Sequence, residues 1–338
     1  MSKTKLRTRG TKEEYEIFPE KVKELKDFFT KMESKHSKPL SQVSITNYTN
    51  KLNRLSTLVQ GKGYDGDNKW LFDAEKVIGK LVDSNVSGKK DFITPVVRLL
   101  KELDAPQETI ALYQKAMSKL KEAEDVSRKG NVATKKDVET YIPLPQIIKS
   151  INDYKPKDDM ELIYKLICSL YFQNTLVPRN DLPTMKFVSA SKKSNQMNPE
   201  FNYITLDKNN TPIDIIMNNY KSKNTYGRQK FPIKAEPREL LKQYIKSYNK
   251  KAGDWLFQMR DGKPFQKPNF IDLIGNATEA VLGKRLTIDL IRRLQITDYY
   301  NGNVKSIAED EADAKRFLHS TNVHKEYLRL GVVKDDED

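Results

Sequence analysis

Hydrophobic residues in the first third of the chain recur every three or four positions, which is the period of an amphipathic α-helix. Five such stretches follow one another, at 22–32, 45–59, 77–81, 92–103 and 110–120. Gly61 predicts the end of the second helix and Pro106 the start of the fifth. No alternation typical of a strand interrupts them. We therefore expect a compact helical domain over 16–125, preceded by a basic arm at 1–15 without regular structure.

The pattern changes after a polar stretch at 126–137, which has no apolar partners and predicts a linker. A second domain over 138–338 begins with a strongly apolar helix around 162–170. Short apolar runs bounded by turn residues then predict strands, at 185–188, 203–206, 213–217 and 229–233. Helical spacing returns at 239–249, 269–282, 287–300, 304–317 and around 323–330. The fold class is mainly α with a small antiparallel β-sheet of about three strands (α+β).

Charge and composition narrow the function. The 338 residues include 60 Lys and Arg against 46 Asp and Glu, a net charge of +14, which favours a polyanionic partner such as nucleic acid. A single cysteine, Cys168, excludes an internal disulfide and a cysteine zinc cluster. No apolar run approaches the ~20 residues of a membrane span, and none follows the basic N-terminus as in a secretory signal. We expect an intracellular protein with no membrane partner.

Several chemistries lack their residues. The chain has no P-loop, no GxGxxG and no GxSxG sequence. Its three histidines, His36, His319 and His324, show no metal-ligand spacing with carboxylates, so we expect no metal and no cofactor. Phosphoryl transfer by a side-chain nucleophile remains open, because it requires only cationic donors, a nucleophile and an acid for the leaving oxygen.

Such a set follows in order along the second domain. Its members are Arg179 at the end of the buried helix, Lys221 in a turn between two strands, Arg292 on a helix, His319 in Leu318-His319-Ser320, and Tyr327. This order resembles the catalytic domain of the tyrosine recombinases and integrases, over roughly 140–330. The local sequences, such as Pro178-Arg179-Asn180-Asp181, look most like the divergent integrases of large DNA viruses, virophages and related mobile elements. The helical domain at 16–125 is similar in kind to the DNA-clamping core-binding domain of that family.

The resemblance implies a role for each position. Arg179 and Arg292 would grip the scissile phosphate, and His319 would donate to one of its oxygens. Tyr327 would attack phosphorus to form a 3′-phosphotyrosyl link, while Lys221 would protonate the departing 5′ oxygen. A site-specific recombinase of this kind needs neither metal nor ATP, binds duplex DNA and assembles as a tetramer on two DNA sites.

The chain departs from the family pattern at Asp289, which stands where His or Lys opens the His-x-x-Arg motif. A carboxylate there repels a phosphate unless it turns toward Arg292 or Arg293. Two alternatives therefore stay open, a catalytically impaired DNA-binding protein on the same fold and a DNA relaxer resembling type IB topoisomerases.

Other residues compete for the same roles. Lys223 and Lys230 are rivals of Lys221, Arg293 of Arg292, and Tyr299 and Tyr300 of Tyr327. Each member of the set also has a structural explanation, such as a helix cap for Arg179. The expected DNA contacts are basic side chains of the linker and of the second domain, which are otherwise solvated charges. They are Arg128, Lys129, Lys135, Lys136, Lys192, Lys193, Lys223 and Arg293.

Overall fold

A computed structural model describes the ranges 4–7, 14–31, 40–129, 135–259, 261–301 and 305–329, together with residues 131 and 133. The chain divides into two compact units, Met1–Ser127 and Arg128–Asp338, each with its own hydrophobic core. No helix in the described ranges is both long enough and apolar enough to cross a membrane.

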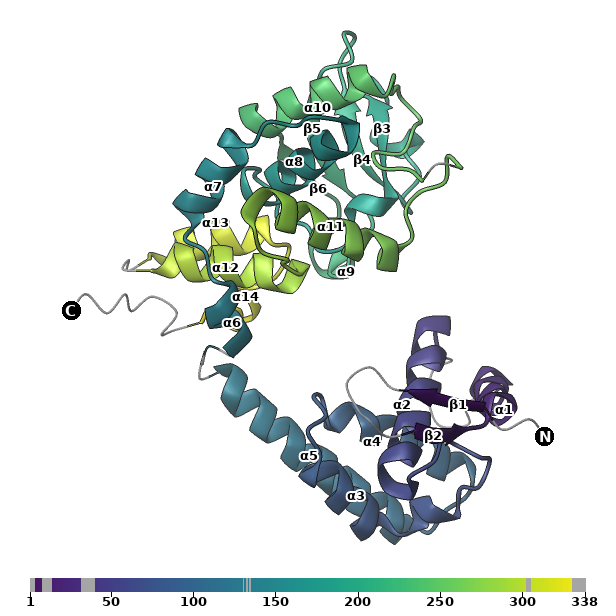
Figure 1. Ribbon diagram of the computed structural model, residues 1–338. Coiled ribbons are helices and arrows are strands. Elements are labelled where there is room, and N and C mark those ends of the chain that lie inside the picture. The colour runs from purple at the N-terminus through teal and green to yellow at the C-terminus, as the bar shows by residue number, and fades with distance from the viewer. Residues whose placement is uncertain are drawn as a thin grey trace. The chain divides into compact units, whose positions relative to one another are not determined.

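The first unit is built on helices that pack against a central one (Figure 1). Helix α2 (Gln42–Gln60) contacts α1 (Pro19–Lys31), α3 (Ala74–Asp83) and α4 (Lys90–Glu102), and the 3-10 turn η1 (Lys69–Phe72) contacts α3. The predicted stop at Gly61 is confirmed, since Gly61 adopts a left-handed φ of 73° and its N–H donates to Thr57 O. Leu52, Leu55 and Leu100 are fully buried in this core.

Part of the expected N-terminal arm is strand. Strand β1 (Thr4–Arg7) pairs antiparallel with β2 (Glu14–Ile17). Alternation over four residues is too short a signal to separate from a basic tail, which is why the hairpin was not expected.

The expected linker at 126–137 is helical over much of its length. Helix α5 (Gln107–Lys129) continues to Lys129, and α6 (Lys135–Thr140) begins soon after. Lys, Glu and Arg recur near the end of α5, and these residues favour helix without needing apolar partners. Polarity indicated solvent exposure here, but not the absence of regular structure.

The second unit contains a four-stranded sheet in the order β3-β4-β5-β6. Its strands are β3 (Met185–Ser189), β4 (Asn202–Leu206), β5 (Pro212–Met217) and β6 (Gln229–Pro232). The expectation of a purely antiparallel sheet of about three strands is wrong, because β3 and β4 run parallel while the other pairs are antiparallel. The connection at 190–201, with the turn η3 (Ser194–Gln196), is long enough to carry the chain back to the starting edge.

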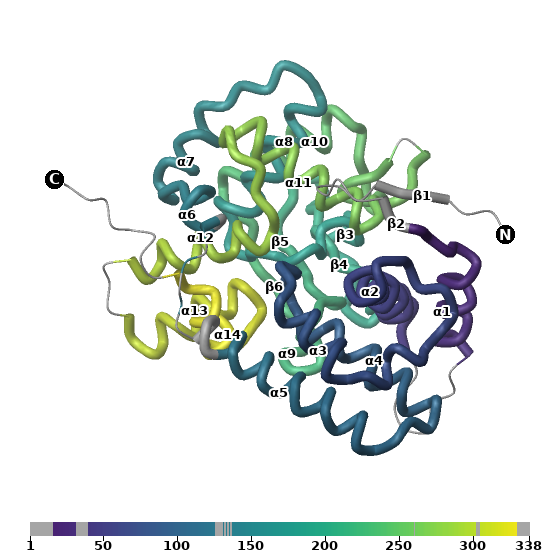
Figure 2. Tube along the Cα trace, turned by 60° about the horizontal axis from the view of Figure 1, so that its bottom comes forward, coloured from purple at the N-terminus to yellow at the C-terminus, as the bar shows by residue number. Residues whose placement is uncertain are grey.

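Most of the second unit outside this sheet is helical, which confirms the mainly helical fold class (Figure 2). The apolar helix α8 (Asp159–Phe172) contacts α7 (Leu144–Asp153), α10 (Ala235–Ser247), α11 (Lys267–Leu282) and α12 (Ile288–Tyr300). Its residues Leu166, Ile167 and Cys168 are fully buried. Helix α13 (Ile307–Arg316) packs on the short α14 (Thr321–Lys325), and both follow α12 in the chain. Two small elements complete the unit, the turn η2 (Leu182–Thr184) and helix α9 (Lys223–Tyr226).

Candidate active site

Arg292, in the middle of α12, is the most deeply buried charged side chain of the site, with 1% of its surface exposed. One guanidinium nitrogen donates to Val177 O at 2.7 Å, and the other donates to Phe317 O at 2.9 Å and lies 3.3 Å from His319 Nδ1. Arg292 therefore ties the loop that follows α8 and the loop that follows α13 to a single helix.

A buried guanidinium is unusual, and the groups around Arg292 explain how its positive charge is stabilised. Burial and, after it, the charge of the nearby Arg179 lower the pKa of Arg292 to about 10, while the Tyr327 hydroxyl opposes the shift. The group stays cationic at neutral pH, since that pKa is still well above 7. The guanidinium carbon lies 5.0 Å from the Phe317 ring centroid and 5.4 Å from that of Tyr327, within the range of cation–π attraction.

Arg179 lies in the bend before η2, beyond the end of α8 rather than at its C-terminus as expected. It therefore does not cap that helix. Its backbone is fixed at both sides, because its N–H donates to Asp181 Oδ2 at 3.0 Å and its carbonyl accepts from Tyr171 Oη at 2.8 Å. Burial raises the pKa of the Asp181 carboxyl, and its hydrogen bond from Arg179 N–H opposes the rise. The half-buried Arg179 side chain is close enough to Arg292 for the two charges to interact.

His319 sits directly against Arg292. Its ring stacks on Phe317 with centroids 5.6 Å apart and an interplanar angle of 12°. Its second nitrogen, Nε2, lies 2.8 Å from His324 Nδ1, so both ring nitrogens of His319 face protein partners. Burial, followed by the charges of Arg292, His324 and Arg179, lowers the pKa of His319 far below its usual range. The imidazole is neutral at physiological pH.

Tyr327 follows α14 and is half-buried. Its N–H donates to His324 O at 3.1 Å, and its ring centroid is 5.5 Å from that of His319. The rival residues Tyr299 and Tyr300 end α12 and turn their rings toward His324, at 6.2 and 5.8 Å. Of these three tyrosines, only Tyr327 has its ring beneath the Arg292 guanidinium in the described contacts.

Lys221 is exposed in the connection between β5 and β6. Among the described residues, no hydrogen bond or ion pair is found for its ammonium group, whereas Lys223 donates to Asn219 Oδ1 at 3.2 Å and Lys230 pairs with Asp214 at 3.0 Å. The adjoining Ser222 hydroxyl donates to Leu318 O at 2.5 Å, which fastens this turn to the residue before His319. The turn thus brings Lys221 to the same side of the unit as His319.

Asp289 does not face Arg292. Its carboxylate is 54% exposed and lies 2.8 Å from Arg293, one turn further along α12. Arg293 also reaches the buried Asp137 on α6 at 2.9 Å, and Asp137 lies 3.6 Å from Arg329. Of the two partners open to Asp289, the structure selects Arg293.

The expected DNA contacts differ in their surroundings. Lys192 and Lys193 are exposed in the connection between β3 and β4, and Lys135 is exposed on α6, 3.7 Å from Glu139. Arg293 is engaged in its two ion pairs and Lys223 in its hydrogen bond. The side chains of Arg128, Lys129 and Lys136 lie outside the described part of the chain.

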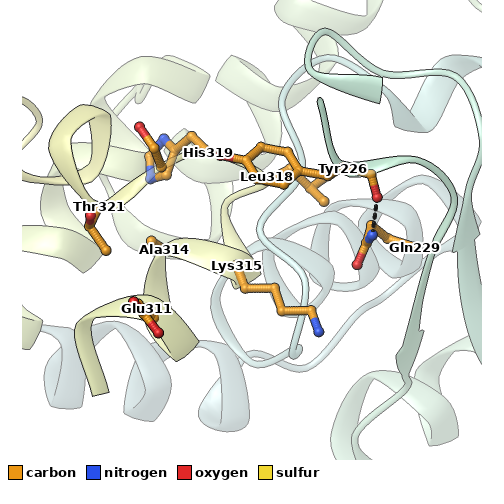
Figure 3. Close-up of a pocket in the computed structure, with 9 residues that line it drawn as sticks. Tyr226, Gln229, Glu311, Ala314, Lys315, Leu318, His319 and Thr321 are labelled. Atoms are coloured by element: carbon orange, nitrogen blue, oxygen red, sulfur yellow. Dashed lines mark hydrogen bonds between the residues drawn. The ribbon is translucent and has the colours of Figure 1, made fainter. Parts of the chain in front are cut away.

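A cavity of about 420 Å³ opens beside His319 (Figure 3). His319 and Thr321 line one side of it, and Tyr226 and Gln229, from α9 and β6, line the other. Lys315 on α13 also points into it. Within the described residues no cluster of three His, Cys, Asp or Glu side chains is placed to hold a metal ion.

Sequence patterns missed the residues that support this site. They are Asp137, Asp313, His324 and Arg329, all with less than a tenth of their surface exposed. The short spacing of His319 and His324 was the only signal among them. The others are polar residues in polar stretches, where burial leaves no trace in the sequence.

Comparison with known proteins gives a distant likeness in structure alone. The chain matches no family profile and no curated protein. Among solved structures it is similar to the crystal structure of XerA recombinase, with 12% sequence identity, a TM-score of 0.34, and coverage of 92% of this chain and 94% of that one.

Proposed function

We propose that this protein breaks and rejoins DNA strands as a tyrosine recombinase, through a 3′-phosphotyrosyl intermediate. The single observation that carries the proposal is the convergence on Arg292. A buried cation, a second arginine, a neutral histidine and a half-buried tyrosine meet there, although they come from four separate segments of the chain. A fixed guanidinium beside a phenol is suited to holding a phosphodiester against a nucleophile.

The proposed reaction uses only side chains of the chain and the DNA. Tyr327 Oη attacks phosphorus and loses its proton to solvent, and the bond from phosphorus to the 5′ oxygen breaks. Arg179 bears the added negative charge on the nonbridging oxygens, and the positive charge of the buried Arg292 behind it stabilises that charge. Lys221, which is exposed and unpaired among the described residues, gives a proton to the departing 5′ oxygen. A 5′ hydroxyl then attacks the phosphotyrosyl bond and regenerates Tyr327.

Exchange between two duplexes takes four such cleavages, so the proposal includes a tetramer on two DNA sites. The net charge of +14 and the exposed Lys192 and Lys193 support a duplex DNA partner. Integration of a viral or mobile element is the setting that the sequence resemblance favours.

The decisive experiment traps the covalent intermediate. A pool of nicked duplexes, in which cleavage releases a short strand, is incubated with the protein, and the adduct is mapped by mass spectrometry. We expect one modified tyrosine, Tyr327. Tyr327→Phe should remove the adduct and keep DNA binding, while Tyr299→Phe and Tyr300→Phe should keep both. An adduct that persists in Tyr327→Phe would reject the assignment.

The role of Lys221 has a separate test. Lys221→Ala should slow cleavage of ordinary DNA but not of DNA with a 5′-bridging sulfur, because a thiolate leaves without a proton. Lys223→Ala and Lys230→Ala serve as matched controls, since those lysines are engaged elsewhere. Equal slowing on both substrates would exclude Lys221 as the acid.

A further inference from the structure

His324 and Asp313 follow His319 in a series of close side-chain contacts, which we call the line. His324 on α14 is 0% exposed and Asp313 on α13 is 4% exposed. His319 Nε2 lies 2.8 Å from His324 Nδ1, and His324 Nε2 lies 3.0 Å from Asp313 Oδ2. Together with the 3.3 Å approach of Arg292 to His319 Nδ1, these distances join four side chains from three helices and a loop.

The positions of the protons along this line follow from donor chemistry. A guanidinium only donates, so His319 Nδ1 facing Arg292 must be the accepting nitrogen. In a neutral imidazole the other nitrogen, Nε2, then carries the hydrogen and donates to His324 Nδ1. His324 consequently carries its own hydrogen on Nε2, which faces the carboxylate of Asp313. The hydrogens of Arg292 and His319 therefore both point along the line toward His324. The last contact, from His324 Nε2 to Asp313 Oδ2, has the distance of an ion pair without the alignment of a hydrogen bond.

The far end of the line is held in place by its own partners. Asp313 Oδ1 accepts from Arg316 at 2.6 Å, which leaves Oδ2 turned toward His324. The second carboxylate of α13 near His324, that of Asp310, pairs with Lys325 at 2.9 Å instead. The rings of Phe317, Tyr299 and Tyr300 lie 5.2 to 6.2 Å from that of His324 and enclose it. This enclosure limits the orientations that the His324 ring can adopt.

We propose that His324 and Asp313 are positioning residues that keep His319 in the tautomer with hydrogen on Nε2. This inference rests on the proposed function for its catalytic meaning. A phosphate oxygen in the cavity beside His319 needs a donor, and the neutral tautomer with hydrogen on Nδ1 would present a bare nitrogen there. The contact with His324 disfavours the tautomer with hydrogen on Nδ1, because His324 Nδ1 can accept a hydrogen bond only when His319 carries its hydrogen on Nε2. Rotation of the His319 ring toward the cavity then presents a nitrogen that already carries its hydrogen.

The inference is tested by ¹⁵N NMR of the imidazoles in the free protein, which reports the tautomer without any DNA. Wild-type His319 should be protonated on Nε2. His324→Asn places an amide oxygen where Nδ1 lies and should preserve this tautomer. His324→Gln reaches toward Asp313 instead and removes the 2.8 Å acceptor from His319. Only the longer 3.3 Å contact with Arg292 then selects the tautomer, and the variant should give a mixture of tautomers. An unchanged His319 spectrum in His324→Gln, or a wild-type His319 protonated on Nδ1, overturns the proposal.

Asp313→Asn provides a second route that does not depend on the folding of His324→Gln. It should weaken the hold on His324, broaden or split the His319 signals, and slow DNA cleavage on the order of 10-fold. Asp310→Asn removes the same charge from the same helix and should leave the His319 signals in place. If both variants shift His319 alike, the line from Asp313 is not the cause. A correct tautomer pattern in a protein that cleaves no DNA would reject the proposed function and leave this inference standing.

Discussion

The carboxylate of Asp137 on α6 lies 2.9 Å from Arg293 on α12, across 156 residues of sequence. The same carboxylate is 3.6 Å from Arg329, whose guanidinium also donates to Glu326 O and Leu328 O on either side of Tyr327. The Arg329 N–H in turn donates to Thr297 Oγ1 at 3.0 Å. One buried acid therefore connects the first helix of the second unit to the segment that carries Tyr327.

Asp137→Asn is expected to destabilise the protein by about 3 kcal/mol, because it leaves two arginines without their buried counter-charge. Urea unfolding measures this loss. The segment at 326–329 should also exchange its amide hydrogens faster than in the wild type. Asp289→Asn is the matched control, since it removes an exposed carboxylate from the same Arg293 and should cost less than about 1 kcal/mol. Equal losses in the two variants would contradict the assigned burial of Asp137.

Asp289→Ala is expected to change the rate of covalent adduct formation less than about fivefold. The carboxylate pairs with Arg293 at the surface, where an ion pair contributes under about 1 kcal/mol, and 1.4 kcal/mol corresponds to a tenfold change in rate. Single-turnover cleavage measures the effect. A large gain in cleavage would instead mean that Asp289 suppresses the reaction, as in the impaired-enzyme alternative.

Arg292→Lys is expected to be severe despite the retained charge. A lysine has one ammonium group and cannot reach Val177 O, Phe317 O and His319 Nδ1 together. Two buried carbonyls lose their donor, which should lower the free energy of unfolding by about 2 to 6 kcal/mol, at about 1–3 kcal/mol for each unsatisfied group. Thermal and urea unfolding measure this, with Arg293→Lys as the control on the same helix. A stability loss no greater than that of the control would contradict the central place of Arg292.

Stability should fall as the pH drops below about 6.5, in part through His319. The folded-state pKa of His319 is lowered, so His319 binds a proton in the unfolded chain at a pH where it stays neutral in the folded chain. The contribution is complete above the unfolded pKa and is lost as the pH falls through it, by about 2 kcal/mol between pH 7 and pH 5. His319→Asn should lack this component. Parallel stability curves for the two proteins over that range would show that His319 titrates normally in the folded state.

Local signals in the sequence predicted most of the helices and strands. Gly61 ends α2 because the turn requires a left-handed backbone conformation, which glycine adopts readily. A glycine after a helical pattern is recognisable from the sequence. The short apolar runs predicted all of the strands in the sheet of the second unit. The pattern of apolar residues does not show, however, whether a neighbouring strand runs parallel or antiparallel. The parallel pairing of β3 with β4 depends on the path of the connection between them.

The sequence could not predict which distant residues come together in the folded protein, for a different reason. Asp137 stands in a polar run, and its burial depends on arginines that lie far along the chain. His324 is close to His319 in sequence, yet their hydrogen bond depends on the turn into α14 at Ser320, whose hydroxyl caps the helix. The partner of Asp289 was likewise undecided between two adjacent arginines until the face of α12 was known.

The bond from the Ser222 hydroxyl to Leu318 O has a mechanical consequence. Leu318 adopts a left-handed φ of 54°, so its peptide has little freedom to adjust without altering the direction of His319. A movement of the turn that carries Lys221 therefore pulls on Leu318, the residue next to His319. If Lys221 and His319 act as proposed, a DNA that displaces this turn would move both residues together.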